Sequence, residues 1–492
     1  MTFFGIGARL APGLGAGLAL AALVAGCVVS QEKEVHTYRQ VLDADQPKPQ
    51  PLQPNEPLSL ERALALANAD NEQLASQGET YLQALIAKGR AFSTFMPTVS
   101  FEPNFTVEQA PRGQSSPASA GAPAVSAAQA AATQGGYVQE GKFLRRFQAP
   151  VVGELTFAPR NVPLYKAAEI GVAQQRQVLL DAQESLLLDV AQTYYQVVIS
   201  SRQVDVLRHS LALQQARLTD TEGRFKVRLA LDLEVSQAQA DEAATRALLS
   251  HAENDVRNGR RTLALLIGAA AVEGPLDAKA LAPAPPVPID SYVDRAFAGR
   301  QDLLAAQNAV EVARYGVKAA VAEYYPSVSL NVAGYLYEEN YADASKWNGI
   351  LSANLPLFTG GAIHADVRDA WSRLRQAALF ESYLRREIEQ GVRTAYDNVL
   401  TSGIVLADLR HEVEAAADAY RQSTGLVRNG LAIPLDVLTA QDTLLNAELQ
   451  YTAEAFNQTI LQLNLIRAAG ELDPTAASKL RWSVPEQLPS VP

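Results

Sequence analysis

The sequence has 492 residues, an apolar fraction of 48% and a formal net charge of −11. This acidic balance, without any run rich in Lys and Arg, argues against nucleic acid as a partner. The single cysteine, Cys27, excludes an internal disulfide and a metal cluster built from thiolates.

The N-terminus has the pattern of a secretory signal peptide over residues 1–26. A basic residue precedes an apolar stretch at 10–23, and the small residues of 24–26 stand directly before Cys27. This pattern is typical of a lipobox, which predicts that the Cys27 thiol is diacylated and anchors the chain stably to a membrane. Val28 follows, rather than an aspartate, and by resemblance to bacterial lipoproteins this favours the outer membrane. The alternative is an ordinary signal peptide with a chance cysteine.

One stretch of the chain occurs twice. The segment that begins at Arg228 recurs with substitutions at Gly430, which gives an offset of 430 − 228 = 202, and residues 190–197 match 392–399 at the same offset. A repeat of this length predicts two structural units of similar plan. The predicted divisions are a signal peptide at 1–26, a lipid-anchored extended tether at 27–54, a first repeat at 55–280, a Pro-rich connector at 281–288, a second repeat at 289–473 and a C-terminal tail at 474–492.

Each repeat contains two segments in which apolar and polar residues alternate. Val99, Phe101 and Phe105 share one face of such a segment, opposite Ser100 and Asn104. The predicted strands lie at about 97–109, 147–158, 326–337 and 347–358. Their length and alternation suit a transmembrane barrel, and because four strands cannot close one, several chains must contribute. The alternative is a half-buried sheet in a soluble domain.

The other segments predict helices. Residues 58–90 form a first helical pattern, and the longest signal runs from Pro163 to about Thr221, with apolar residues every seven positions from Val190. A helix of about 58 residues is on the order of 90 Å long, which suits the crossing of an aqueous gap. The second repeat carries the same pattern 202 residues later, and the returning helices end near Gly268 and Gly470. The prediction is two long coiled-coil hairpins.

Motifs for catalysis are lacking in the sequence. It contains no nucleotide-binding glycine loop, no HExxH and no nucleophile elbow, and its five histidines show no metal-ligand spacing. We therefore expect a protein that is not an enzyme and that needs no cofactor or metal.

Three motifs together resemble the bacterial outer-membrane efflux factors, the TolC-like family, and within it the lipid-anchored subgroup of RND-type tripartite systems. The motifs are the repeated turn Leu-Ala-x-x-Leu-Asp/Glu-Val-x-x-Ala-Gln, the segment 299–306 and the segment 355–361. The resemblance implies a mainly α fold with a transmembrane part: a homotrimer whose twelve strands, four per chain, form an outer-membrane β-barrel on a periplasmic α-helical tunnel. It also implies a periplasmic membrane-fusion adaptor and an inner-membrane RND-type pump as partners.

The resemblance places the repeated turns at the periplasmic tip of the tunnel. The residues offered to the adaptor would be Arg228, Leu229, Ala230, Gly430, Leu431 and Ala432. Asp436, with Glu234 as its counterpart, would form the periplasmic gate. The alternative role for Asp436 is a carboxylate that stabilises a helix N-terminus. Because Arg228 stands where the second repeat has Gly430, we expect a tighter bend and more of the gating at the second turn.

Other functions share part of this pattern. A soluble periplasmic coiled-coil scaffold or adaptor would have the same heptads and export signal, but it would not need the strand alternation. Within the family, protein secretion or metal efflux would replace drug efflux. The sequence does not distinguish drug efflux from protein secretion or metal efflux, because the inner-membrane partner selects the cargo.

Overall fold

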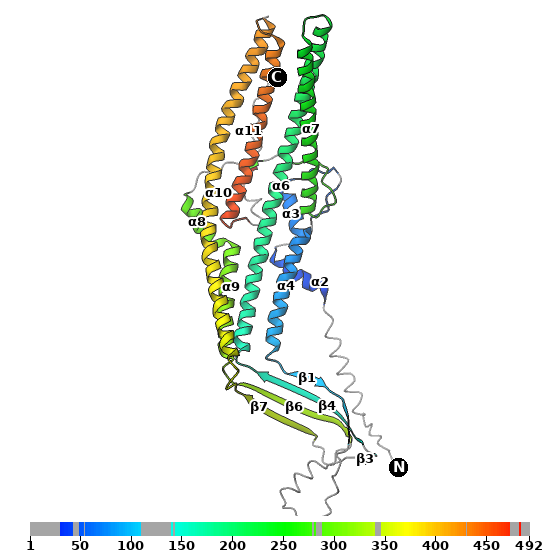
Figure 1. Ribbon diagram of the computed structural model, residues 1–492, viewed down its shortest axis with the longest axis vertical. Coiled ribbons are helices and arrows are strands. Elements are labelled where there is room, and N and C mark those ends of the chain that lie inside the picture. The colour runs from blue at the N-terminus through cyan, green and yellow to red at the C-terminus, as the bar shows by residue number, and fades with distance from the viewer. Residues whose placement is uncertain are drawn as a thin grey trace, which may run out of the picture.

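The computed structural model describes residues 30–42, 49–53, 55–109, 139–140, 143–277, 280–281, 288–339, 346–429, 431–472 and 482–483. The molecule is elongated, with a curved sheet at one end and the tips of two helical hairpins at the other (Figure 1). The signal peptide, Cys27, the loop at 110–136, Gly430 and most of the connector and tail lie outside the described residues.

Two long helical hairpins form most of the fold. The first consists of α6 (Asn161–Lys226) and α7 (Asp232–Leu266), and the second of α10 (Ala362–Arg428) and α11 (Pro434–Ala468). The predicted helical hairpins are thus present in both repeats. The heptad positions Val190, Val197 and Val204 are buried on α6, whereas Leu211 and Leu218 of the same predicted series are half-buried.

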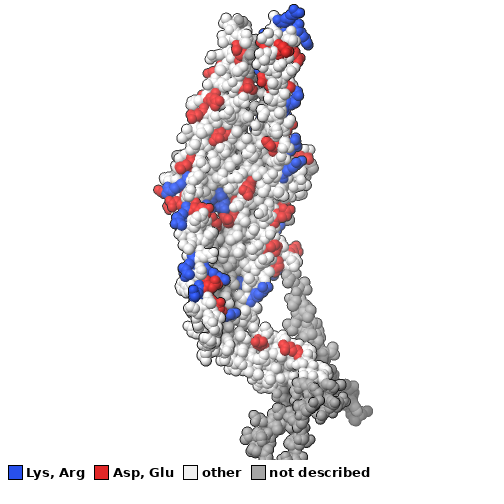
Figure 2. Space-filling model, viewed as in Figure 1, with Lys and Arg blue, Asp and Glu red and all other residues white. Residues whose placement is uncertain are grey.

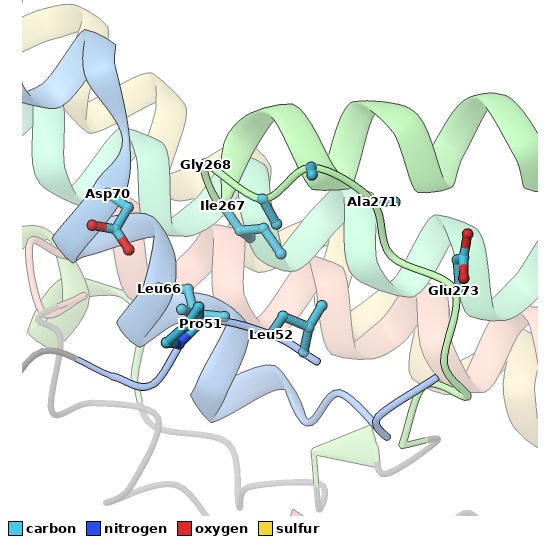
Figure 3. A pocket seen from close by; sticks show the side chains of 10 residues that line it. Pro51, Leu52, Leu66, Asp70, Ile267, Gly268, Ala271 and Glu273 are labelled. Carbon is cyan, nitrogen blue, oxygen red and sulfur yellow. The ribbon is translucent and has the colours of Figure 1, made fainter. Parts of the chain in front are cut away.

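Both returning helices end in the same way. Gly268 after α7 and Gly470 after α11 have φ of +66° and +73°, a conformation that favours glycine at a helix C-terminus. A Cβ on Gly268 would lie 2.6 Å from the Asp70 carbonyl oxygen, and one on Gly470 would lie 2.8 Å from the Arg300 nitrogen. Figure 3 shows Gly268 and Asp70 beside the pocket between α3 (Leu60–Asp70) and the segment after α7. The repeat therefore extends to these helix ends.

The single helix predicted over 58–90 is two helices. α3 ends at Asp70, and α4 (Glu72–Ser93) begins after Asn71. The Leu74 amide donates to Asn71 Oδ1 at 2.9 Å, while Asn71 Nδ2 donates to the Leu266 carbonyl at 2.9 Å. Asn71 thus caps α4 and ties it to the end of α7, and this bond to a distant helix is why the continuous helical pattern gave the wrong prediction.

The predicted extended tether contains a helix, α2 (Gln31–Val41). It packs on α4 through Tyr38. The ring of Tyr38 occupies the space that a side chain at position 78 would need, and this is possible because residue 78 is glycine. The prediction of an extended segment over all of 27–54 was wrong because the four prolines lie only at 47–54, after the helix.

The strands form one antiparallel sheet in the order β1, β4, β6, β7. Their bounds are β1 (Thr98–Phe101), β2 (Asn104–Gln109), β3 (Gln139–Glu140), β4 (Phe143–Phe157), β6 (Ser327–Glu339) and β7 (Trp347–Asn354). β1 and β2 pair with β4 in one continuous register, so the first predicted strand is a single edge interrupted at Pro103, which has no amide hydrogen. β7 ends four residues earlier than predicted, before Pro356.

The register assigns apolar and polar side chains to opposite faces of the sheet. Leu155, Leu330 and Leu351 stand directly opposite one another on β4, β6 and β7, and the next row contains Glu154, Asn331 and the apolar Ile350. The three leucines are exposed in the single chain, with 73% of Leu351 accessible. This face is apolar and uncovered, which agrees with the alternation predicted from the sequence.

The core lies midway along the molecule, where α2, α3, α4, α6 and the ends of α7 and α11 meet. The buried Tyr194 hydroxyl is 2.8 Å from the Leu58 carbonyl oxygen and 2.9 Å from that of Asp277. The elements α8 (Ile289–Gly299) and α9 (Gln301–Ala322) lead from this level towards β6, and β5 (Ala280–Leu281) pairs with β8 (Trp482–Ser483). Among the described helices, none has the length and hydropathy needed to cross a membrane.

Candidate functional site at the hairpin tips

The tip of the first hairpin is the turn between α6 and α7. Arg228 has a φ of +64°, unusual for a residue with a side chain, and the Leu229 amide donates to the Arg224 carbonyl at 2.8 Å. Leu229 and Leu231 are exposed, and Lys226 precedes them in the last turn of α6. Figure 2 shows a group of cationic side chains at this end of the α6–α7 hairpin. This tip is therefore an exposed surface that combines apolar and basic side chains.

The tip of the second hairpin closes with the equivalent hydrogen bond. The Leu431 amide donates to the Leu426 carbonyl at 2.9 Å, 202 residues after the bond of the first tip. Leu431 and Ile433 are exposed, as their counterparts are. The closing bond is thus the same at both tips, and at the first tip Arg228 adopts a left-handed conformation without being glycine. The tighter bend expected at the second turn involves Gly430, which lies outside the described residues.

The two carboxylates predicted at the gate lie directly behind the tips. Glu234 Oε2 accepts from the Leu231 amide at 3.4 Å, and Asp436 Oδ2 accepts from the Ile433 amide at 3.1 Å. Each carboxylate thus satisfies a backbone donor at the start of a returning helix, where the helix dipole also favours negative charge. Both side chains are exposed. This is the geometry expected for carboxylates that stabilise a helix N-terminus, the alternative role considered for Asp436. It leaves each carboxylate accessible to solvent.

The described docking residues lie on the tips of the two hairpins, at the end of the molecule opposite the sheet (Figure 1), and Gly430 lies outside the described residues. Arg228, Leu229 and Leu431 are exposed, while Ala230 and Ala432 are half-buried. No group of His, Cys, Asp and Glu among the described residues has an arrangement that could hold a metal ion.

The sequence reasoning missed a charged cluster, half-buried except for the buried Glu184, that joins the two repeats near mid-length. Arg467 on α11 forms an ion pair with Asp181 on α6 and lies 3.1 Å from Glu184 Oε2. Arg300 and Asp302 at the start of α9 form a bidentate pair at 3.0 and 2.6 Å. Burial raises the pKa of Glu184 to about 7, and this outweighs the opposite effect of Arg467. The motif at 299–306 contains two members of this cluster, Arg300 and Asp302. The sequence does not indicate that they lie near charged residues of α6 and α11.

A comparison with protein families matches the Outer membrane efflux protein family over residues 93–269 and 292–471. Among curated relatives, the outer membrane efflux protein BepC of Brucella suis is 24% identical over 311 residues, which cover 62% of this chain and 68% of BepC. The outer membrane protein TolC of Escherichia coli is 25% identical over 311 residues, which cover 59% of this chain and 62% of TolC. The aligned part thus spans about two thirds of these relatives.

Solved structures show the same fold. The CmeC outer membrane channel of Campylobacter jejuni superposes with a TM-score of 0.70 at 16% identity, covering 85% of this chain and 88% of CmeC. The family match covers both repeats, from the end of α4 to the end of α7 and from α8 to the end of α11. The chain therefore belongs to the outer membrane efflux protein family.

Proposed function

We propose that three copies of this chain form the outer-membrane outlet of a tripartite efflux system, a passive conduit for drugs or other small molecules. The proposal rests mainly on the sheet. It has one apolar face, one polar face and two unpaired edges, β1 and β7. Lipid accepts an apolar face but no open edge, so the edges must pair between copies. Twelve strands from three chains then close a barrel whose polar face lines the passage.

The helical hairpins extend from this barrel through the periplasm. Their tips receive the adaptor through the residues Arg228, Leu229, Ala230, Gly430, Leu431 and Ala432. The adaptor connects the tunnel to an inner-membrane RND-type pump, which selects and energises the cargo. On this proposal the chain itself performs no reaction and needs no cofactor. A soluble periplasmic scaffold would leave the apolar face of the sheet uncovered, which disfavours that alternative.

We further propose that Asp436 and Glu234 contribute negative charge to the closed tunnel entrance. This proposal is supported by two observations: the two carboxylates lie directly behind the hairpin tips, and both side chains are exposed. Carboxylates in a narrow aqueous passage repel one another and favour cations. The capping role does not conflict with this, because a carboxylate can accept an amide hydrogen bond and keep its charge.

The test is single-channel recording in planar bilayers. Asp436→Ala should raise conductance and lower cation preference, but it also removes the cap. Asp436→Asn separates the two effects, since an asparagine oxygen still accepts from the Ile433 amide while the charge is lost. Glu234→Gln is the matched change at the first tip. Wild-type conductance and selectivity in all three variants would refute the gate assignment, and a wild-type protein that forms no channel would refute the proposed function.

A further inference from the structure

The two hairpin tips correspond to one another through the internal repeat, but their charges differ. An offset of 202 residues carries the turn 223–231 of the first tip onto the turn 425–433 of the second. The corresponding pairs are Arg224 and Leu426, Lys226 and Arg428, and Arg228 and Gly430. The first turn thus holds three cationic residues and the second holds one, and neither turn contains a carboxylate. The two tips share one plan but differ in their chemistry.

The three cationic side chains of the first tip are exposed and are not used by the fold. Arg224, Lys226 and Arg228 are all exposed. Further from the tip, the same hairpin pairs its charges across the two helices, as where Arg208 Nη2 lies 2.8 Å from Glu253 Oε1. Within the described part of the chain, no carboxylate pairs with any of the three tip cations. Their charge is therefore available to a partner.

Exposed apolar side chains alternate with these cations. Phe225, Val227 and Leu229 are 44%, 64% and 70% accessible. In Figure 2 cationic side chains gather at the outer end of the α6–α7 hairpin. Exposed apolar groups rimmed by charged ones are typical of a surface that binds another protein. The partner that fits this surface carries apolar side chains and carboxylates.

The backbone at Arg228 is a second reason to assign a function to the cations. Its φ of +64° lies in the left-handed region, which is unfavourable for a residue with a side chain. Glycine adopts this conformation readily, and the sequence has glycine at the corresponding position 430. An arginine held in an unfavourable backbone conformation, at a turn that glycine could close, points to a use for its side chain.

We propose that the first tip selects its partner by charge: Arg224, Lys226 and Arg228 bind a helical segment of the adaptor that presents carboxylates beside apolar side chains. The apolar residues of the tip supply contact area, whereas the cations decide which segment is accepted, because charge complementarity governs partner choice more than affinity. Each chain then offers one charge-selective tip and one mainly apolar tip. The inference rests on the proposed function, in which the tips receive the adaptor, and it adds the chemistry of the accepted segment.

The test is the binding of two synthetic helical hairpin peptides to the full-length protein in nanodiscs of phosphatidylcholine. The peptides are identical except at three exposed positions beside their turn, which are glutamate in one and glutamine in the other. Fluorescence anisotropy measures the dissociation constants at about 0.05 M and about 0.5 M NaCl, because salt screens exposed charges. The wild type should bind the glutamate hairpin about tenfold more tightly at low salt, from three exposed charge pairs, and should lose most of this preference at high salt.

A double variant separates the role of the tip cations from a general effect of charge. Arg224→Leu with Arg228→Gly gives the first tip two residues of the second and removes two charges. The matched control, Arg176→Leu with Arg202→Leu, removes two exposed arginines of the same helix away from the tip. The tip variant should lose most of its preference for the glutamate hairpin, and the control should keep it. Circular dichroism and native gels check that both variants fold and assemble.

Equal affinity of the wild type for the two hairpins would overturn the proposal. So would an unchanged preference in the tip variant, or an equal loss of preference in the control. Wild-type protein that floats with phosphatidylglycerol vesicles but binds neither hairpin would also overturn it, because the cations would then face a lipid surface. None of these results touches the proposed function as long as the wild type conducts in planar bilayers, whereas a wild type that forms no channel would refute that function.

Discussion

At the scale of single residues, the ionisation of Glu184 links the stability of the fold to pH. Its side chain is 9% accessible, and its pKa is raised from an ordinary 4.5 to about 7 because burial disfavours the charged form. The folded protein therefore binds a proton that the unfolded chain releases between these two values. Its contribution is largest below pH 4.5 and is lost as pH rises towards 7.

We predict that Glu184→Gln flattens this part of the pH profile. In the wild type the free energy of unfolding should fall by on the order of 3 kcal/mol between pH 4.5 and 7, because each pH step between the two pKa values costs about 1.4 kcal/mol. Thermal unfolding at pH 5, 6, 7 and 8 measures it, and the difference between variant and wild type should grow in favour of the variant with rising pH. If the stability of variant and wild type changed with pH in parallel, the raised pKa of Glu184 would not be the cause of the pH dependence.

The charged cluster also shows where prediction from sequence stops. The sequence did not predict that Asp181, Glu184 and Arg467 come together, because it does not show which helices meet. Cys27 and the docking residues, by contrast, could be named from local motifs. Of the proposed docking residues, Arg228, Leu229 and Leu431 are exposed, and their docking role stays a prediction.

At the scale of elements, the contact between α2 and α4 depends on a glycine. The ring of Tyr38 lies where a Cβ of Gly78 would be, whereas nothing lies within 4 Å of a Cβ on Gly89 of the same helix. α2 could not be predicted from sequence, because its packing depends on a residue 40 positions away. The four helices of the hairpins could be predicted, since their periodicity is long and occurs twice.

We predict opposite effects for the same substitution at these two glycines. Gly78→Ala should displace α2 and speed tryptic cleavage at Lys33 and Arg39, while overall unfolding changes little. Gly89→Ala should leave cleavage unchanged and stabilise α4 by roughly 0.5–1 kcal/mol, because alanine restricts the unfolded chain. Equal cleavage rates in both variants would show that Tyr38 does not hold α2 in place.

At the scale of the whole molecule, the proposed lipid anchor and the sheet would hold the same chain to one membrane. The alternation in the strands was enough to predict the sheet and its two faces, since a period of two does not depend on distant contacts. The division of the first strand at Pro103 and the early end of the last, before Pro356, are local effects of residues that interrupt pairing.

We predict that Cys27→Ser abolishes labelling by radioactive palmitate but leaves assembly intact, because the sheet alone suffices to hold the oligomer in the membrane. Native gels of membranes from labelled cells measure both properties in one sample. A labelled Cys27→Ser protein would refute the lipid anchor, and an unlabelled protein that is lost from the membrane fraction would refute the independence of the sheet.

The burial of α6 decreases towards the tip of its hairpin, where the helix keeps hydrogen bonds to α7 and α11 but no buried residue of its own. Val204 is the last buried residue of this helix, which continues to Lys226. The remaining 22 residues form a stiff lever of about 33 Å, and a tilt of about 10° at its base moves the end by about 6 Å. On the proposed function, three copies leaning outwards together would widen the tunnel entrance by a distance comparable to the width of a small drug, while the packing around Tyr194 stays fixed.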